Sequence, residues 1–166
     1  MPRIKGLLLN TLEKATDARI DVFLVQSLKN HPCIHGNKEQ NQMGNLIYEE
    51  ESYKLLGICM EVHNQLGAGF LEIVYKDALE YELKKSNIPF EREREYEVQY
   101  KDTILPHKFY ADFVIYDKII LEIKGVNGIA DEFLAQCINY LKVSENKLAL
   151  LVNFGEMRLQ YKRIVL

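Results

Sequence analysis

Two carboxylates and a lysine, Asp112, Glu122 and Lys124, lie close together in the sequence and could support metal-dependent chemistry. Because successive side chains of a strand point to opposite faces, Glu122 and Lys124 share one face, about 7 Å apart along the strand. Burying two carboxylates and an ammonium on one patch of a sheet costs free energy, so a functional reason is expected. Binding of Mg²⁺ is such a reason, because this ion prefers hard oxygen ligands. The lysine could then orient water or stabilise charge on a phosphate. The same spacing also fits a solvated strand face with a surface ion pair.

The elements that must position these residues follow one another in the order ααβββαββ. Apolar stripes at helical spacing predict helices, and alternating apolar and polar side chains predict strands. The expected helices cover residues 49–66, 70–85 and 131–143, and the expected strands cover residues 96–100, 104–115, 119–124, 147–154 and 158–165. We expect the strand over 147–154 to be buried on both faces and the strand over 158–165 to lie at an edge. The sequence therefore predicts an α/β fold with a mixed central sheet flanked by helices.

A turn over residues 116–118 joins the strands that carry the acidic residues. The resulting hairpin should place Asp112 beside Glu122. Leu121 and Ile123 should point to the opposite face, into the core. On the last helix, Asp131 or a neighbour is expected to be the N-cap.

Residues 1–45 differ in pattern from the rest of the chain. We predict a helix over residues 11–28, although its apolar positions are unevenly spaced, and a linker over residues 29–44, which are polar and rich in Asn and Gln. Met43 stands just before the first strongly periodic helix. We therefore hypothesise that residues 1–45 lie outside the native fold, that translation begins at Met43, and that residues 46–166 form the domain. An intact mass equal to that of the full chain would contradict the start at Met43.

The composition is that of a globular protein, because 48% of the 166 residues are hydrophobic and 27% are charged. No window reaches the ~18 apolar residues of a membrane span, so no membrane partner is expected. The three cysteines are far apart and odd in number, which argues against a disulfide framework or a cysteine metal site and favours the cytoplasm. The net charge of −3 gives no support to a basic nucleic-acid-binding tail, although a local basic groove is compatible with it.

Several separated motifs resemble the PD-(D/E)XK nuclease superfamily, with Asp112 and Glu122-Ile123-Lys124 as its motif. Ala111 stands where the superfamily's name has proline. The resemblance is closer to a bacterial branch, the GxxExxY proteins. The stretches that resemble this branch are Gly69-Phe-Leu-Glu72-Ile-Val-Tyr75, Glu61-Val-His63, Gln136-Cys-Ile-Asn-Tyr140-Leu-Lys142 and Leu151-Val-Asn153-Phe154. The resemblance spans residues 46–166 and implies a restriction-endonuclease-like fold, whose αβββαβ core agrees with the predicted order.

The resemblance also implies a metal site. Glu72, Asp112 and Glu122 would hold Mg²⁺ or Mn²⁺, with the backbone carbonyl of Ile123 as a further ligand, and Lys124 would assist the water and the transition state. The residue type at Glu72 has a second explanation, because a glutamate in the first turn of a helix is favoured by the helix dipole.

Three further residues enter the candidate site through the resemblance. Gln136 and Tyr140 are four residues apart and share a helix face. They resemble the Gln-x-x-x-Tyr motif of nuclease domains attached to bacterial recombination helicases, where these side chains lie beside the metal and the DNA strand. Alternatively, Tyr140 packs in the core and Gln136 completes a hydrogen bond. His63 is included because of the Glu-Val-His stretch, although a lone histidine is more often a satisfied polar residue.

These implications favour a metal-dependent nuclease that hydrolyses phosphodiester bonds, with DNA as the leading partner. The alternative is a non-catalytic nucleic-acid-binding or protein-interaction module on the same fold. Arg92 and Arg94 share a strand face that could contact phosphates, but the interleaved glutamates favour a solvated charged strand. An exposed final strand could pair two copies into a homodimer. The sequence contains no glycine-rich phosphate loop of the P-loop or Rossmann type.

Overall fold

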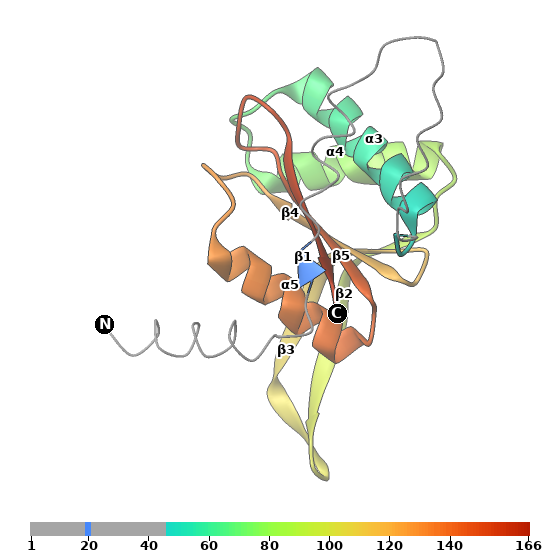
Figure 1. Ribbon diagram of the computed structural model, residues 1–166, viewed down its shortest axis with the longest axis vertical. Helices are drawn as coiled ribbons and strands as arrows, with labels where there is room; N and C mark the ends of the chain where they lie inside the picture. Colours follow the sequence, from blue (N-terminus) through green and yellow to red (C-terminus); the bar gives the residue numbers. More distant parts are fainter. Residues whose placement is uncertain (1–18, 21–45) are drawn as a thin grey trace, which may run out of the picture.

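A computed structural model of the protein describes residues 19–20 and 46–166. Its elements are β1 (Arg19–Ile20), α3 (Glu49–Leu66), α4 (Glu72–Lys85), β2 (Phe90–Tyr100), β3 (Thr103–Ile115), β4 (Ile119–Lys124), α5 (Asp131–Ser144), β5 (Leu148–Asn153) and β6 (Gln160–Val165). The strands form one sheet in the order β1-β6-β5-β4-β3-β2, shown in Figure 1. β4 and β5 are parallel and the other neighbours are antiparallel. The predicted mixed α/β sheet flanked by helices is confirmed.

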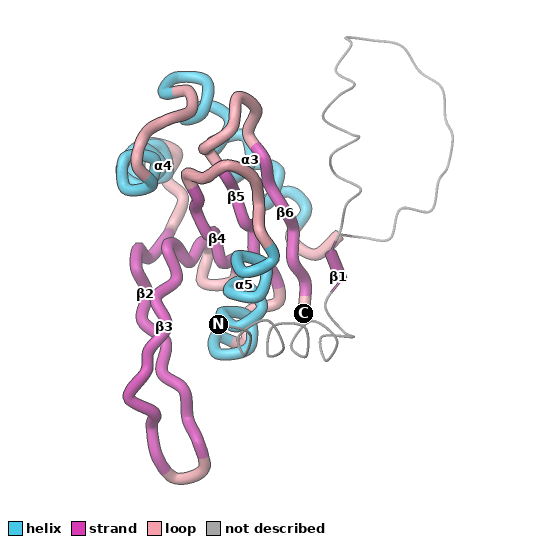
Figure 2. Tube along the Cα trace, turned by 90° about the vertical axis from the view of Figure 1, so that its left-hand side faces the viewer, coloured by secondary structure: helices cyan, strands magenta, loops and turns pink. Residues whose placement is uncertain are grey.

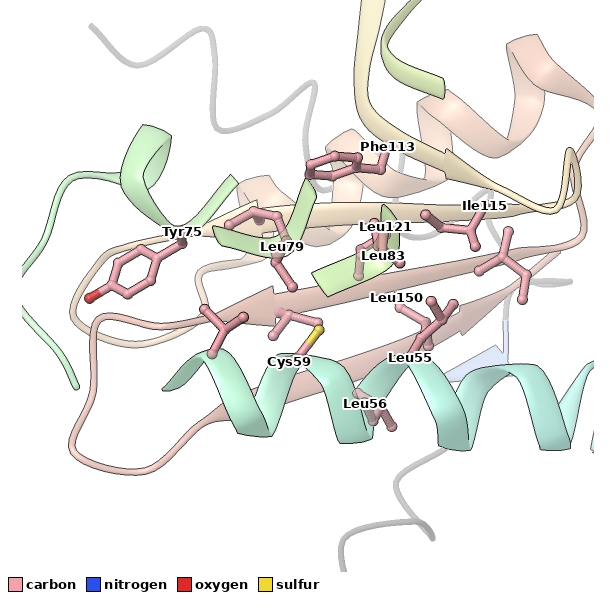
Figure 3. Packing of buried hydrophobic residues seen from close by; sticks show 14 of the residues in the cluster. Leu55, Leu56, Cys59, Tyr75, Leu79, Leu83, Phe113, Ile115, Leu121 and Leu150 are labelled. Carbon is pink, nitrogen blue, oxygen red and sulfur yellow. The ribbon is translucent and has the colours of Figure 1, made fainter. Parts of the chain in front are cut away.

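The sheet is covered on both faces, and this sandwich explains the continuous apolar run of β5. α3 and α4 pack on one face, where Figure 3 shows their side chains close to Leu121 and Leu150. α5 packs on the other face, over Ile120 and Leu151. Because side chains alternate along a strand, Leu121 lies on the α3–α4 face and its neighbour Glu122 on the α5 face. The free thiols of Cys59 and Cys137 are buried, in the core of one face each.

β3 has one neighbour for most of its length and two only near its end. It pairs with β2 from Thr103 to Ile115, but with β4 only from Phe113 to Ile115. The remainder of the β2–β3 hairpin therefore extends away from the sheet as an arm, as Figure 2 shows. Asp112 stands at the point where β3 and β4 separate.

Several expected boundaries need correction. α4 begins at Glu72 rather than at residue 70, since Leu71 has an extended backbone (φ −65°, ψ 149°) and is the N-cap. The N-cap of α5 agrees with its expected place, because it is Ala130, the neighbour of Asp131; it makes no side-chain cap hydrogen bond. β2 begins at Phe90, six residues earlier than predicted, because cross-strand pairing with β3 extends through the charged stretch.

The N-terminal prediction is wrong at the two residues where it can be compared with the structure. Arg19–Ile20 form a strand rather than part of a helix, and pair with Val165 and Ile164. The final strand β6 is therefore not at the edge over those two residues. The rest of the helix predicted over residues 11–28, the linker and the start at Met43 lie outside the described residues. In the part of the chain that the structure describes, no helix is both long and apolar enough to cross a bilayer.

Candidate metal and active site

Asp112 connects β3 to β4 at the point where the two strands separate, which we call the fork. Its Oδ2 accepts a hydrogen bond from the backbone N–H of Ile123 at 2.8 Å, and its Oδ1 accepts one from Nζ of Lys76 at 2.7 Å. A buried backbone N–H needs a partner, and at Ile123 the carboxylate supplies what a neighbouring strand would otherwise supply. The sequence predicts that Asp112 lies beside Glu122, and the structure joins it to Ile123, the residue that follows Glu122 in β4.

Glu122 and Lys124 form a buried pair on the α5 face. Nζ of Lys124 donates to Oε1 of Glu122 at 2.7 Å, and Glu122 is only 1% exposed. The second oxygen, Oε2 of Glu122, is buried and has no hydrogen-bond partner. Buried polar atoms are rarely left in this state in proteins. The pair is therefore not the solvated surface ion pair of the alternative interpretation, and one carboxylate oxygen remains available to a further ligand.

The site shifts the pKa values of both members of this pair. Burial, aided by the negative charge of Asp112, raises the pKa of Glu122 to about 7 against the opposing effect of Lys124. Burial disfavours the charge on Lys124, but the Glu122 carboxylate outweighs it and holds the pKa of Lys124 above its ordinary value. Lys124 therefore stays a cation and a hydrogen-bond donor.

The raised pKa of Glu122 predicts a pH-dependent stability in metal-free buffer. Between pH 4.5 and about 7 the folded chain holds a proton that the unfolded chain has lost, so the free energy of unfolding falls as the pH rises. The contribution is complete below pH 4.5 and lost above about pH 7, and amounts to about 3 kcal/mol. Urea titrations in EDTA at several pH values should show a smaller fall for Glu122→Gln than for the wild type.

The matched control is Glu132→Gln, which changes an exposed glutamate in the first turn of α5. This variant should keep the wild-type pH dependence. The same dependence in Glu122→Gln would show that Glu122 does not titrate in this range.

Lys76 connects α4 to the fork. Its Nζ lies 2.7 Å from Oδ1 of Asp112 and 3.6 Å from Oε1 of Glu72. Burial disfavours its charge, but the hydrogen bond to Asp112 and the nearby carboxylates raise the pKa of Lys76. Sequence reasoning missed Lys76, although its position four residues after Glu72 places both side chains on one helix face.

Gln136 and Tyr140, on α5, lie against β3 close to the fork. The hydroxyl of Tyr140 donates to the carbonyl of Tyr110 at 2.7 Å and accepts from Nε2 of Gln136 at 2.8 Å. Tyr140 is buried, and its burial raises its pKa. These contacts hold α5 against β3 two residues before Asp112. They match the alternative in which Tyr140 packs in the core and Gln136 completes a hydrogen bond, so both are positioning residues in this arrangement.

His63 and Tyr75 lie on the α3–α4 side of the sheet. The His63 ring bonds the carbonyl of Glu156 through Nε2 at 2.9 Å rather than a site carboxylate. Tyr75 stacks on Phe154 with 4.7 Å between ring centroids, and its hydroxyl donates to the carbonyl of Gly67 at 2.9 Å. Tyr75 thus holds the loop that leads into α4, and α4 begins with Glu72. His63 forms a hydrogen bond with the loop between β5 and β6. The structure does not bring His63 to the carboxylates.

Asn153 holds the loop that follows Lys124 and was missed as a positioning residue. It is fully buried and stands opposite Lys124 in the β4–β5 register. Its Oδ1 accepts from the backbone N–H groups of Val126 and Gly155 at 3.0 and 3.1 Å. Its Nδ2 donates to the Val126 carbonyl at 2.8 Å and to Oε1 of Gln160 at 3.1 Å. One side chain therefore fastens the two loops at the end of β4 and β5.

We predict that Asn153→Ala lowers the free energy of unfolding by about 2–4 kcal/mol, because the fully buried Asn153 side chain makes four hydrogen bonds that alanine cannot replace. Chemical denaturation of the full chain measures this loss. Asn64→Ala, on the exposed side of α3, is the control and should change stability by less than about 0.5 kcal/mol. Equal stability of the two variants would contradict the assigned role of Asn153.

The side chains of the site can be compared with what a divalent metal ion needs as ligands. Among the residues that the structure describes, no three His, Cys, Asp or Glu side chains converge closely enough to hold one ion. Lys76 pairs with both Glu72 and Asp112. The donor chemistry nevertheless fits, since Oε2 of Glu122 is a buried oxygen without a hydrogen-bond partner and the charge of Asp112 is close enough to act on Glu122. Carboxylate oxygens of this kind suit Mg²⁺ or Mn²⁺.

Comparison with known proteins adds independent information. A family model described as the PD-(D/E)XK nuclease superfamily matches residues 49–164. No curated protein matches the chain. Among solved structures, the crystal structure of SSO0001 is similar with a TM-score of 0.44 and 23% sequence identity, over 71% of this chain. The match spans 59% of the length of that protein.

Proposed function

Because the chain belongs to the PD-(D/E)XK nuclease superfamily, we propose that it is a metal-dependent nuclease that hydrolyses phosphodiester bonds, with DNA as its main substrate. The match begins with α3 and ends within β6, so it covers the three helices α3, α4 and α5 and the strands from β2 into β6, but not β1. The observation that carries the proposal is the buried, unpartnered Oε2 of Glu122, beside a lysine and next to Asp112. Membership of the GxxExxY branch and a cytoplasmic location are further parts of the proposal.

We propose the following roles for the residues of the site. Asp112 and Glu122 would hold Mg²⁺ or Mn²⁺, with Glu72 and the Ile123 carbonyl as further ligands. A bound ion would polarise a phosphoryl oxygen and lower the pKa of water. Lys124 donates one N–H to Glu122, and an ammonium has three donors. Its other donors can therefore bind a phosphate and stabilise the charge that develops there.

The arginines of β2 contribute little to phosphate binding in this proposal. Arg92 pairs with Glu80 at 2.6 Å and Asp77 at 2.7 Å, and Arg94 pairs with Asp117 at 2.5 Å. Their charges are neutralised locally, in agreement with the solvated charged strand considered from the sequence. Phosphate contacts are expected to centre on the lysines of the site.

A non-catalytic nucleic-acid-binding or protein-interaction module remains the second candidate. The observation that favours it is the full use of the Asp112 carboxylate, one oxygen by Lys76 and the other by Ile123. A module of this kind would keep its ion pairs in the presence of metal and would hydrolyse nothing.

A substrate panel tests the two candidates. The full chain is incubated with labelled single-stranded DNA, double-stranded DNA and RNA, each with Mg²⁺, with Mn²⁺ or with EDTA. The nuclease proposal predicts metal-dependent cleavage of DNA that unlabelled DNA inhibits by competition. Binding of nucleic acid without cleavage under any condition would favour the module.

A further inference from the structure

Lys76 is the second lysine of the site. It differs from Lys124 in that its carboxylate partner has no oxygen without a hydrogen bond. Lys124 binds one oxygen of Glu122 and leaves the other without a partner. Lys76 binds Oδ1 of Asp112, whose Oδ2 already accepts the N–H of Ile123. Both oxygens of Asp112 are therefore engaged, and the cation that engages one of them comes from the protein itself.

We propose that Lys76 acts as an internal counter-ion that competes with a divalent metal ion for Asp112, so that its displacement sets the metal affinity of the site. The inference rests on the proposed metal site and deepens it. In the structure Lys76 pairs with Asp112 and Lys124 pairs with Glu122, and a metal ion that bound Asp112 would replace the ammonium of Lys76.

The mobile partner of Asp112 is Lys76 rather than Ile123. The N–H of Ile123 belongs to the backbone of a central strand and cannot withdraw without breaking the sheet. The Lys76 ammonium is carried on a flexible four-carbon stem, and its side chain is 13% exposed at the margin of the site. Its second carboxylate, on Glu72, is 3.6 Å away with a side chain that is 36% exposed. The ammonium can therefore move towards Glu72 or solvent while the fork remains closed.

Charge explains why the ammonium and the metal ion exclude one another. An ion between Asp112 and Glu122 would lie close to the ammonium that already binds Asp112. The repulsion between a divalent and a monovalent cation is twice that between two monovalent cations at the same distance. Removing the charge of Lys76 should therefore strengthen metal binding, while replacing it by another cation should not.

The test is a calorimetric titration of the full chain with Mn²⁺. Lys76→Met should lower the Kd for Mn²⁺ about tenfold or more, and Lys76→Arg should keep the wild-type Kd. Lys84→Met is the control, because Lys84 also pairs with a glutamate four residues away on α4 but is 65% exposed and lies about 12 Å further along the helix than Lys76. If Lys76→Met does not fold, Lys76→Gln serves in its place, since its amide can still donate to Asp112.

A double variant assigns the gain to Asp112. Adding Asp112→Asn to Lys76→Met should abolish the gain in affinity. Unchanged or weaker Mn²⁺ binding by folded Lys76→Met, with normal binding by the wild type, would overturn the inference and leave the proposed function intact. Absence of Mn²⁺ binding in the wild type and in Lys76→Met would overturn the proposed metal site together with the inference.

Discussion

Lys124→Met is expected to lower the rate of DNA hydrolysis by about 10²–10³-fold, because it removes a preorganised donor aimed at developing charge. Methionine keeps the length of the side chain and fits among the apolar neighbours of the site, which include Phe133, whose ring centroid is 5.3 Å from Nζ. The fold should therefore persist. Mn²⁺ binding should not weaken, because Lys124 is a donor and not a metal ligand. Initial rates of cleavage and a Mn²⁺ titration of the same preparation measure both effects.

Lys142→Met is the control for this prediction, since Lys142 is exposed in the last turn of α5. It should cleave at close to the wild-type rate. A Lys124→Met enzyme that stays within a factor of about three of the wild type would remove Lys124 from the catalytic machinery.

Glu122→Gln is expected to weaken Mn²⁺ binding roughly 100-fold and to reduce DNA cleavage in proportion at low metal concentration. The substitution keeps the shape of the side chain but replaces the carboxylate, whose Oε2 has no hydrogen-bond partner, by a neutral amide. The buried charge of Lys124 also loses its partner, so stability must be measured in parallel. Calorimetry gives the Kd for Mn²⁺, and cleavage rates over a range of Mg²⁺ concentrations give the activity.

Glu132→Gln again provides the control, because it makes the same chemical change at an exposed glutamate in the first turn of α5. It should leave both readouts unchanged. Wild-type Mn²⁺ affinity in a folded Glu122→Gln protein would mean that the ion, if bound, lies elsewhere.

Local sequence patterns predict much of this fold. The helix expected over residues 49–66 and the strand expected over 119–124 have the observed bounds. Both depend on short-range periodicity, and each is bounded by a glycine or a tight turn. The juxtaposition of Asp112, Glu122 and Lys124 also follows from local rules, since one hairpin and the alternation of a single strand decide it.

Features that depend on distant contacts were not predictable from these patterns. Lys76 gains its importance from Asp112, 36 residues away, and Asn153 from Val126, 27 residues away. The Glu72–Lys76 spacing was a usable signal, but it indicates a helix pair and does not reveal a third partner. The charged start of β2 carries no apolar alternation, and in the described part of the chain only one of its side chains, that of Arg92, is joined to α4 by ion pairs. His63 was included because the Glu61-Val-His63 stretch resembles a family motif, and a short resemblance does not tell which groups the side chain contacts; in the structure it contacts the carbonyl of Glu156.

The most direct test of the proposed function is a reversible metal-dependence experiment on labelled DNA. Hydrolysis by the full-length wild type should start with Mg²⁺, stop when EDTA is added and resume with excess Mg²⁺. The Glu122→Ala/Lys124→Ala double variant, prepared identically, should hydrolyse nothing at any stage. Cleavage that persists in EDTA, or that the double variant retains, would contradict a nuclease whose metal site and donor are Glu122 and Lys124.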